Sequence, residues 1–180
     1  MSQAAHIDLR LPRESDLASI TILIRTTFTV DAIPGWTRET LQTIYEENEG
    51  ERLRKSVDSA AHACVAMSGE ETVGYIHFSR PHLLAIIAID PKMQGRGLGS
   101  NMLERAISEV SATNPDTELL QLSATERSEP FYSKHGFYPI SPMLDVEGRR
   151  FVRMALWLRP RRLGWLQVTG RKDGCTPSRE

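Results

Sequence analysis

The chain has 180 residues, of which 40% are hydrophobic and 25% charged, a composition typical of a soluble globular domain with a sizeable core. The formal net charge of −1 gives no support for binding to nucleic acid or to an anionic membrane. Cys64 and Cys175 form neither a CxxC motif nor a disulfide framework, and the first residues contain no apolar run of the signal-peptide type. We therefore expect a cytoplasmic protein.

The first part of the chain predicts a strand, two helical segments and a hairpin. HIDLRL (6–11) alternates apolar and polar residues, which indicates a strand. Helical spacing of apolar residues then predicts a helix over 17–28. A second helix is expected over 37–57 with a break at Gly50, because glycine costs about 1 kcal/mol relative to alanine within a helix. HACVAMSGEETVGYIHFS (62–79) predicts two strands around the turn SGEE.

The middle of the chain predicts a strand–helix–strand unit. HLLAIIAID (82–90) is almost wholly apolar, as is typical of a strand buried on both faces of a sheet. A glycine-rich loop follows, then a helix over 100–112 and a short apolar strand, LLQLSA (119–124). Two strands joined in this way are expected to be parallel, with a right-handed crossover.

The last part predicts a short helix and two strands. EPFYSKHGF (129–137) reads as a helix closed by Gly136. FYPI and RRFVRMALWL predict the final strands, with DVEG (145–148) as the turn between them. We assign residues 1–158 to a single mixed α/β domain and residues 159–180 to a basic, loosely ordered tail.

The loop QGRGLGS (94–100) stands between an apolar strand and a helix. A helix N-terminus exposes backbone N–H groups and carries about half a positive charge, and glycine allows a phosphate to approach these groups closely. The alternative is a tight turn that needs glycine for its own geometry. A Walker loop is excluded because Ser100-Asn101 replaces the required Lys-Ser/Thr. A dinucleotide fingerprint lacks its third glycine here, and a kinase loop would lie near the start of a much longer chain.

Two motifs together resemble one family. Gln94-x-x-Gly97-x-Gly99, after Ile89-Asp90-Pro91, resembles the acetyl-CoA loop of the GCN5-related N-acetyltransferase (GNAT) superfamily. EPFYSKHGF resembles the late helix of that family, which ends Phe/Leu-Tyr-x-x-x-Gly-Phe. The resemblance covers about residues 7–158. It implies the GNAT fold, with a mixed central sheet of about six or seven strands, flanking helices, and a splayed parallel pair that forms the acyl-CoA cleft.

The resemblance also implies a set of coenzyme contacts. Backbone N–H groups of 94–100 would hold the diphosphate, and the end of the preceding strand would pair with the pantetheine arm. Arg96 would either contact a phosphate or remain a solvated loop cation. Thr125 replaces an Asn, and Ser128 a small Ala, that the family often has. The implied coenzyme-binding residues are Ala88, Ile89, Gln94, Gly95, Arg96, Gly97, Leu98, Gly99, Ser100 and Thr125.

Tyr132 stands where many family members have a tyrosine general acid. A phenol with a pKa near 10 is neutral at pH 7 and is able to protonate a leaving thiolate; the alternative is that Tyr132 only packs its helix against the sheet. The general base stays open. Histone-acetylating members have a Glu at the position of Leu83. His77, His82 and Glu126 are candidates, and so are a water chain or an amine that is already neutral.

The activity that the resemblance implies is transfer of an acetyl group from acetyl-CoA to a primary amine of a small molecule or peptide. The transfer would be a direct attack in a ternary complex, without a metal. Residues 28–47 and 141–147 would contact the acceptor, with Trp36 and Tyr45 as apolar walls. The glutamates of the second helix either attract a cationic amine or form a solvated helix face; these are Glu46, Glu47 and Glu49.

Two other functions fit part of the sequence. An inactive acyl-CoA-binding sensor or regulatory module would keep the glycine loop but would not need Tyr132. A nucleotide-binding protein of another α/β fold would need a Lys after the loop. We expect no nucleic-acid or membrane partner; homodimers occur among proteins of this kind, but no feature of the sequence demands one.

Overall fold

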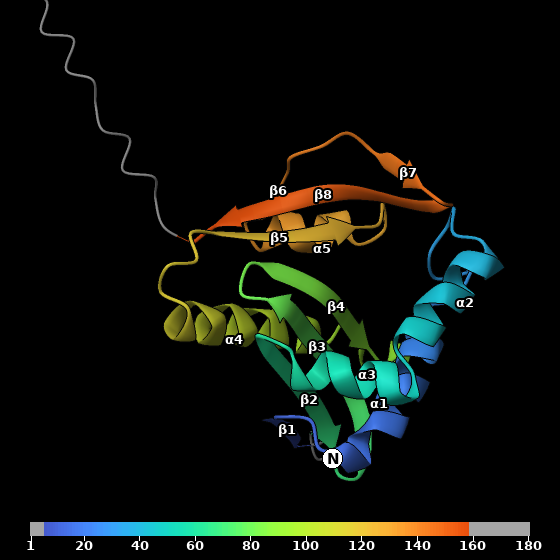
Figure 1. The fold of residues 1–180 in the computed structure, drawn as a ribbon, viewed down its shortest axis with the longest axis vertical. Coiled ribbons are helices and arrows are strands. Elements are labelled where there is room, and N and C mark those ends of the chain that lie inside the picture. The colour runs from blue at the N-terminus through green and yellow to red at the C-terminus, as the bar shows by residue number, and fades with distance from the viewer. Residues whose placement is uncertain (1–5, 159–180) are drawn as a thin grey trace, which may run out of the picture.

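The computed structural model describes residues 6–158 and is drawn in Figure 1; the tail expected over 159–180 lies outside the described residues. The helices and strands follow the order that the sequence predicts, with one additional strand, β7. The elements are β1 (Ile7–Arg10), α1 (Leu17–Thr27), α2 (Arg38–Glu47), α3 (Gly50–Asp58), β2 (His62–Ser68), β3 (Glu71–Arg80), β4 (Leu83–Ile89), α4 (Leu98–Thr113), β5 (Leu119–Ala124), α5 (Glu129–Lys134), β6 (Tyr138–Pro139), β7 (Leu144–Val146) and β8 (Arg149–Trp157), with short 3₁₀ turns at Glu14–Asp16 and Pro91–Met93.

The strands form a mixed sheet in the order β1-β2-β3-β4-β5-β8-β6, with β7 paired to β8. Neighbouring strands of the described chain are antiparallel except for β4 and β5, which are parallel. Helix α4 connects these two strands, as expected for a parallel pair. The sheet therefore has two antiparallel halves, β1 to β4 and β5 to β8, which meet at the β4–β5 pair (Figure 1).

Helices cover both faces of this sheet. Tyr75 of β3 packs in a cluster with Ile20 of α1 and Leu53 of α3. Phe78, which points to the other face of the same strand, packs in a cluster with Met102 of α4. The same second cluster also contains Tyr132 of α5. Helices α1 and α3 thus cover one face, and α4 and α5 cover the other.

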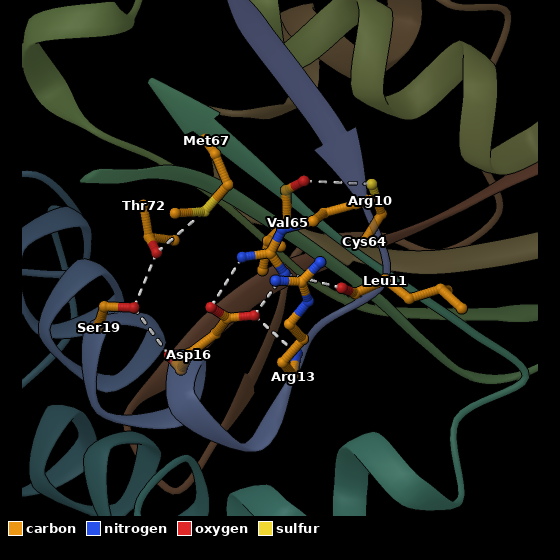
Figure 2. Close-up of polar contacts among 9 residues, drawn as sticks. All are labelled: Arg10, Leu11, Arg13, Asp16, Ser19, Cys64, Val65, Met67 and Thr72. Carbon is orange, nitrogen blue, oxygen red and sulfur yellow. Dashed lines mark hydrogen bonds and ion pairs between the residues drawn. The ribbon is translucent and has the colours of Figure 1, made fainter. Parts of the chain in front are cut away.

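A buried carboxylate fixes the start of α1 (Figure 2). Asp16 accepts hydrogen bonds from Arg10 at 2.6 and 2.9 Å and from the backbone N–H of Arg13 at 2.6 Å. The hydrogen bond from Arg10 holds the pKa of Asp16 below its usual range. Ser19 Oγ lies 2.7 Å from Thr72 Oγ1 on β3. These contacts tie the beginning of α1 to β1 and β3.

The expected break at Gly50 is present. Thr37 caps α2, since its Oγ1 accepts a hydrogen bond from the N–H of Thr40 at 3.1 Å. Helix α2 ends at Glu47, and α3 begins at Gly50. Gly50 has φ +53°, a conformation that favours glycine over residues with a side chain.

The mixed α/β fold is confirmed, but within residues 6–158 the sheet has eight strands rather than six or seven. The additional strand is β7, part of which had been assigned to the turn DVEG. Leu144–Val146 pairs with β8, and the turn is confined to Glu147 and Gly148, with φ values of +53° and +73°. A three-residue strand is too short to show alternation, and for this reason the sequence pattern missed it.

Candidate functional site

The parallel strands β4 and β5 separate almost as soon as they meet. Their register contains one residue pair, Leu83 with Gln121, and the N–H of Gln121 donates to the carbonyl of His82 at 2.7 Å. Beyond this point β4 runs on to Ile89 and β5 to Ala124 without further pairing in the described structure. An opening inside the sheet results, with polar backbone groups of both strands at its edges.

A β-bulge lies where β4 leaves β5. His77 of β3 is opposite Ile86, whereas the next residue, Phe78, is opposite Leu84. Ala85 is therefore the extra residue on β4. A bulge of this kind bends its strand and increases the local twist, so it turns β4 away from β5. No residue pattern in the sequence marks it.

A cleft of about 1000 Å³ occupies this opening. Its walls come from both faces of the sheet, so the cleft passes between the two halves of the molecule. The α1–α2 side contributes both apolar and polar residues, the strands contribute their edges, and the glycine loop and α5 close the other side. Among the lining residues are Phe28, Ile33, Trp36, Ile44, His77, Ser79, Ala85, Ile86, Ile87, Ile89, Gln94, Gly95, Gly97, Gly99, Ser100, Ser123, Thr125, Phe131 and Tyr132.

The glycine loop has the geometry of an exposed backbone surface at a helix N-terminus. Gly97 is the N-cap of α4 with φ +85°, and Gly95 has φ +72°. A Cβ atom built on either glycine meets nothing within 4 Å. Both explanations for the glycines therefore apply. The tight turn needs the backbone conformation of glycine, and the absence of side chains leaves the backbone open to a phosphate. The first turn of α4 presents unpaired N–H groups here.

Two side chains anchor this loop to the sheet. The amide of Gln94 donates from Nε2 to the carbonyl of Ile89 at 3.0 Å, which joins the loop to the end of β4. Leu98 is buried in the core beneath the loop, so only its backbone faces outward. Arg96 is exposed and is not among the residues that line the cleft.

The other residues expected at the coenzyme lie at the cleft in different ways. Ile89 lines it, but its carbonyl already accepts hydrogen bonds from Gln94 and, at 3.3 Å, from Thr27. Ala88 is fully buried and does not line it. Thr125 lines it, with Oγ1 3.0 Å from Oγ of Ser128. The hydroxyl of Thr125 is thus engaged within its own turn.

Tyr132 lies on the α4–α5 side of the cleft. Its ring packs edge-on against Phe131 and Phe137, with centroid distances of 5.1 and 5.8 Å. Its exposed fraction is 6%, and burial raises the pKa of its phenol above the usual value. The phenol is therefore neutral at pH 7 and retains a proton to donate.

His77 lines the cleft on the opposite side of the sheet. Its imidazole stacks on Tyr75, which belongs to the α1-facing cluster. The exposed fraction of His77 is 3%, and Nε2 has no hydrogen-bond partner among the described residues. Burial lowers its pKa to about 4. The other two candidate bases, His82 and Glu126, are exposed and do not line the cleft.

Polar contacts join the α1–α2 region to the β7–β8 turn and the first residues of β8; the turn lies beside the start of α2 in Figure 1. Trp36 Nε1 donates to the carbonyl of Arg150 at 3.2 Å, and Thr40 Oγ1 donates to that of Glu147 at 3.3 Å. Glu47 and Arg149 form an ion pair at 3.4 Å. These contacts hold the two halves of the molecule together across the cleft.

Of the two aromatic residues predicted to contact the acceptor, only one lines the cleft. Trp36 lines the cleft, whereas Tyr45 does not; the hydroxyl of Tyr45 donates to the carbonyl of Phe28. Glu46 accepts a hydrogen bond from Gln42, and Glu49 pairs with Arg25. Glu47 is paired with Arg149, so arginines neutralise two of these three glutamates.

Several other observations bound the chemistry. Cys64 is buried in β2, and burial raises the pKa of its thiol to about 11, so it is not a reactive thiolate. Within residues 6–158 no group of three or more His, Cys, Asp or Glu side chains is placed to hold a metal ion. Over the same residues, no helix is both long and apolar enough to cross a membrane.

Comparison with known proteins identifies the family. The sequence model of the acetyltransferase (GNAT) domain matches residues 27–158, and the chain therefore belongs to the GNAT acetyltransferase family. No curated protein matches the sequence.

Solved structures share the fold at low sequence identity. A GCN5-related N-acetyltransferase from Rhodopseudomonas palustris has a TM-score of 0.72 at 13% identity, over 88% of this chain and 99% of its own. PaiA N-acetyltransferase from Thermoplasma acidophilum, in complex with coenzyme A, has a TM-score of 0.68 at 17% identity, over 84% of this chain and 99% of its own. A GNAT family acetyltransferase from Brucella melitensis, in complex with acetyl-CoA, has a TM-score of 0.58 at 14% identity, over 87% of this chain and 90% of its own.

The buried imidazole in the cleft leads to a prediction about stability. A histidine with its pKa lowered to about 4 takes up a proton in the unfolded chain before it does so in the folded one. The free energy of unfolding that depends on keeping His77 neutral is fully present above the unfolded pKa of about 6.5. It is lost as the pH falls towards the pKa of the folded state. His77→Leu removes this loss and also removes the unpartnered Nε2. The variant should gain stability relative to wild type, and the gain should grow from pH 7 to pH 4.5, as measured by urea unfolding.

Proposed function

We propose that the chain is an N-acetyltransferase that transfers an acetyl group from acetyl-CoA to a primary amine by direct attack in a ternary complex. The observation that carries this proposal is a cleft running through the sheet where β4 and β5 diverge. It places the glycine loop and Tyr132 on one side and the α1–α2 region on the other. A thioester at the centre of the opening would then be accessible from both sides.

The cleft fits coenzyme A in three respects. The open N–H groups of 94–100 suit a diphosphate, and the free edge of β4 suits the two amides of pantetheine, which would pair with it as a short strand does. Lys134 lines the cleft near the loop and supplies a cation for the phosphates. Coenzyme-bound relatives of the same fold support this assignment.

The chemistry needs one proton to move from nitrogen to sulfur. The amine nitrogen attacks the thioester carbonyl carbon, a C–N bond forms, the C–S bond breaks, and a thiol and an amide result. A backbone N–H on β4, freed by the bulge at Ala85, polarises the carbonyl oxygen. Tyr132 donates its hydroxyl proton to the departing sulfur and regains a proton that the amine loses.

His77 is unsuited to the role of general base. An alkylammonium has a pKa of about 10.4, whereas that of His77 is about 4, so moving the proton to the imidazole would cost roughly 9 kcal/mol. We assign His77 instead as a hydrogen-bond acceptor for an N–H of an amine that binds in its neutral form. Its unpartnered Nε2 would then gain a partner on acceptor binding.

The acceptor would enter from the α1–α2 side. Phe28, Trp36 and Ile44 line this part of the cleft, and the nearby glutamates are paired with Arg25 and Arg149 or hydrogen-bonded to Gln42. The body of the acceptor would contact these apolar side chains, and Asp31 also lines the cleft. An inactive acyl-CoA-binding module remains the alternative; it would bind the coenzyme without releasing thiol.

The first prediction of the proposal concerns the loop backbone. Gly97→Ala should weaken acetyl-CoA binding about tenfold, because a Cβ at φ +85° displaces the amides that hold the diphosphate. Isothermal titration calorimetry measures the dissociation constant. Gly69→Ala is the matched control, since Gly69 also has a positive φ and open space around it but lies in the β2–β3 turn. Equal affinity of Gly97→Ala and wild type would contradict the proposed cradle.

The second prediction concerns Tyr132. Tyr132→Phe should lower the rate of amine-dependent thiol release from acetyl-CoA about 100-fold, while the dissociation constant of acetyl-CoA stays the same. The assay screens small-molecule and peptide amines and follows the free thiol. Tyr138→Phe, at an exposed tyrosine of β6, serves as the control and should retain full activity. An unchanged rate would remove the general-acid role, and the absence of thiol release with every amine would favour the inactive module.

A further inference from the structure

A chain of polar side chains lies behind the glycine loop. Ser100 Oγ is 3.0 Å from His135 Nε2, and His135 Nδ1 is 3.4 Å from Glu104 Oε1. The side chain of His135 has an exposed fraction of 8%, whereas that of Glu104 is 68% exposed. The imidazole is thus a buried link between one hydroxyl at the cleft and one carboxylate at the surface.

This link joins the two elements that carry the proposed site. Ser100 lies in the first turn of α4, directly after the loop glycines, and lines the cleft. His135 is the C-cap of α5, three residues after Tyr132. The ring of Phe131 packs against His135 at a centroid distance of 4.9 Å, which fixes the imidazole from another side. The orientation of the Ser100 hydroxyl therefore depends on α5.

We propose that His135 is a positioning residue for the coenzyme diphosphate and acts through Ser100. A serine hydroxyl has one proton to donate. If Nε2–H of His135 donates to Ser100 Oγ, the hydroxyl proton of Ser100 is free to point at a phosphate oxygen. If the hydroxyl instead donates to the imidazole ring, its proton is not available to the phosphate. Glu104 faces Nδ1, so a proton on that nitrogen also has an acceptor.

This inference rests on the proposed binding of acetyl-CoA, and a double-mutant cycle tests it separately. Ser100→Ala should weaken acetyl-CoA binding about tenfold, because a hydrogen bond to a charged phosphate is lost. His135→Leu should weaken it to a similar degree, and the double variant should be no weaker than either single variant. His135→Gln keeps an N–H donor and should restore most of the affinity. Calorimetric titration with acetyl-CoA gives all the constants.

A shortened ligand separates positioning from a merely structural role. Acetyl-pantetheine lacks the diphosphate, so His135→Leu should leave its kcat/KM unchanged. The inference is overturned if His135→Leu binds acetyl-CoA as wild type does, if the two substitutions are additive, or if the variant loses both ligands equally. If wild-type protein does not bind acetyl-CoA at all, the proposed function itself fails. Ser100→Ala places a good helix former in α4, so it remains informative even if His135→Leu folds poorly.

Discussion

The site depends on one constraint, the almost immediate separation of two parallel strands. β4 and β5 are paired at Leu83 and Gln121, and the bulge at Ala85 then turns β4 away. A continuous parallel pair would satisfy its backbone groups internally and leave no opening. Because pairing stops, backbone donors and acceptors are left at the edge of a cleft, where buried polar groups need a partner. A ligand with amide groups of its own supplies that partner.

The two halves of the sheet stay together because other contacts replace the missing ladder. Helix α4 crosses between them on one face, and its cluster includes residues of both halves, such as Phe78 and Met154. On the other face, Trp36 donates a hydrogen bond to β8 and Thr40 donates one to the β7–β8 turn. Contacts on both faces of the sheet therefore bridge the two halves beside the opening. This division also separates the proposed roles, with Tyr132 on one face of the sheet and His77 on the other.

Much of this arrangement could be predicted from the sequence, since its signals are local. The apolar run of β4 followed by the glycine loop, and the late helix ending at Gly136, indicated the fold, and the family match confirmed it. Gly97 has a positive φ, as expected if the loop is a tight turn that needs glycine for its own geometry. What could not be predicted depends on register. The bulge at Ala85 leaves no trace in a residue pattern, and β7 is too short for alternation to reveal it.

Hydrogen–deuterium exchange with and without acetyl-CoA tests directly whether the coenzyme binds to the backbone of the glycine loop and of β4, because it reports on the backbone amides themselves. With acetyl-CoA we expect slower exchange in two segments, the loop at 94–100 and those amides of 85–89 that do not pair with β3. Amides of β1 and β2, remote from the cleft, should exchange at the same rate in both states. If the ligand binds and neither segment becomes protected, the splayed strands are not where the coenzyme lies.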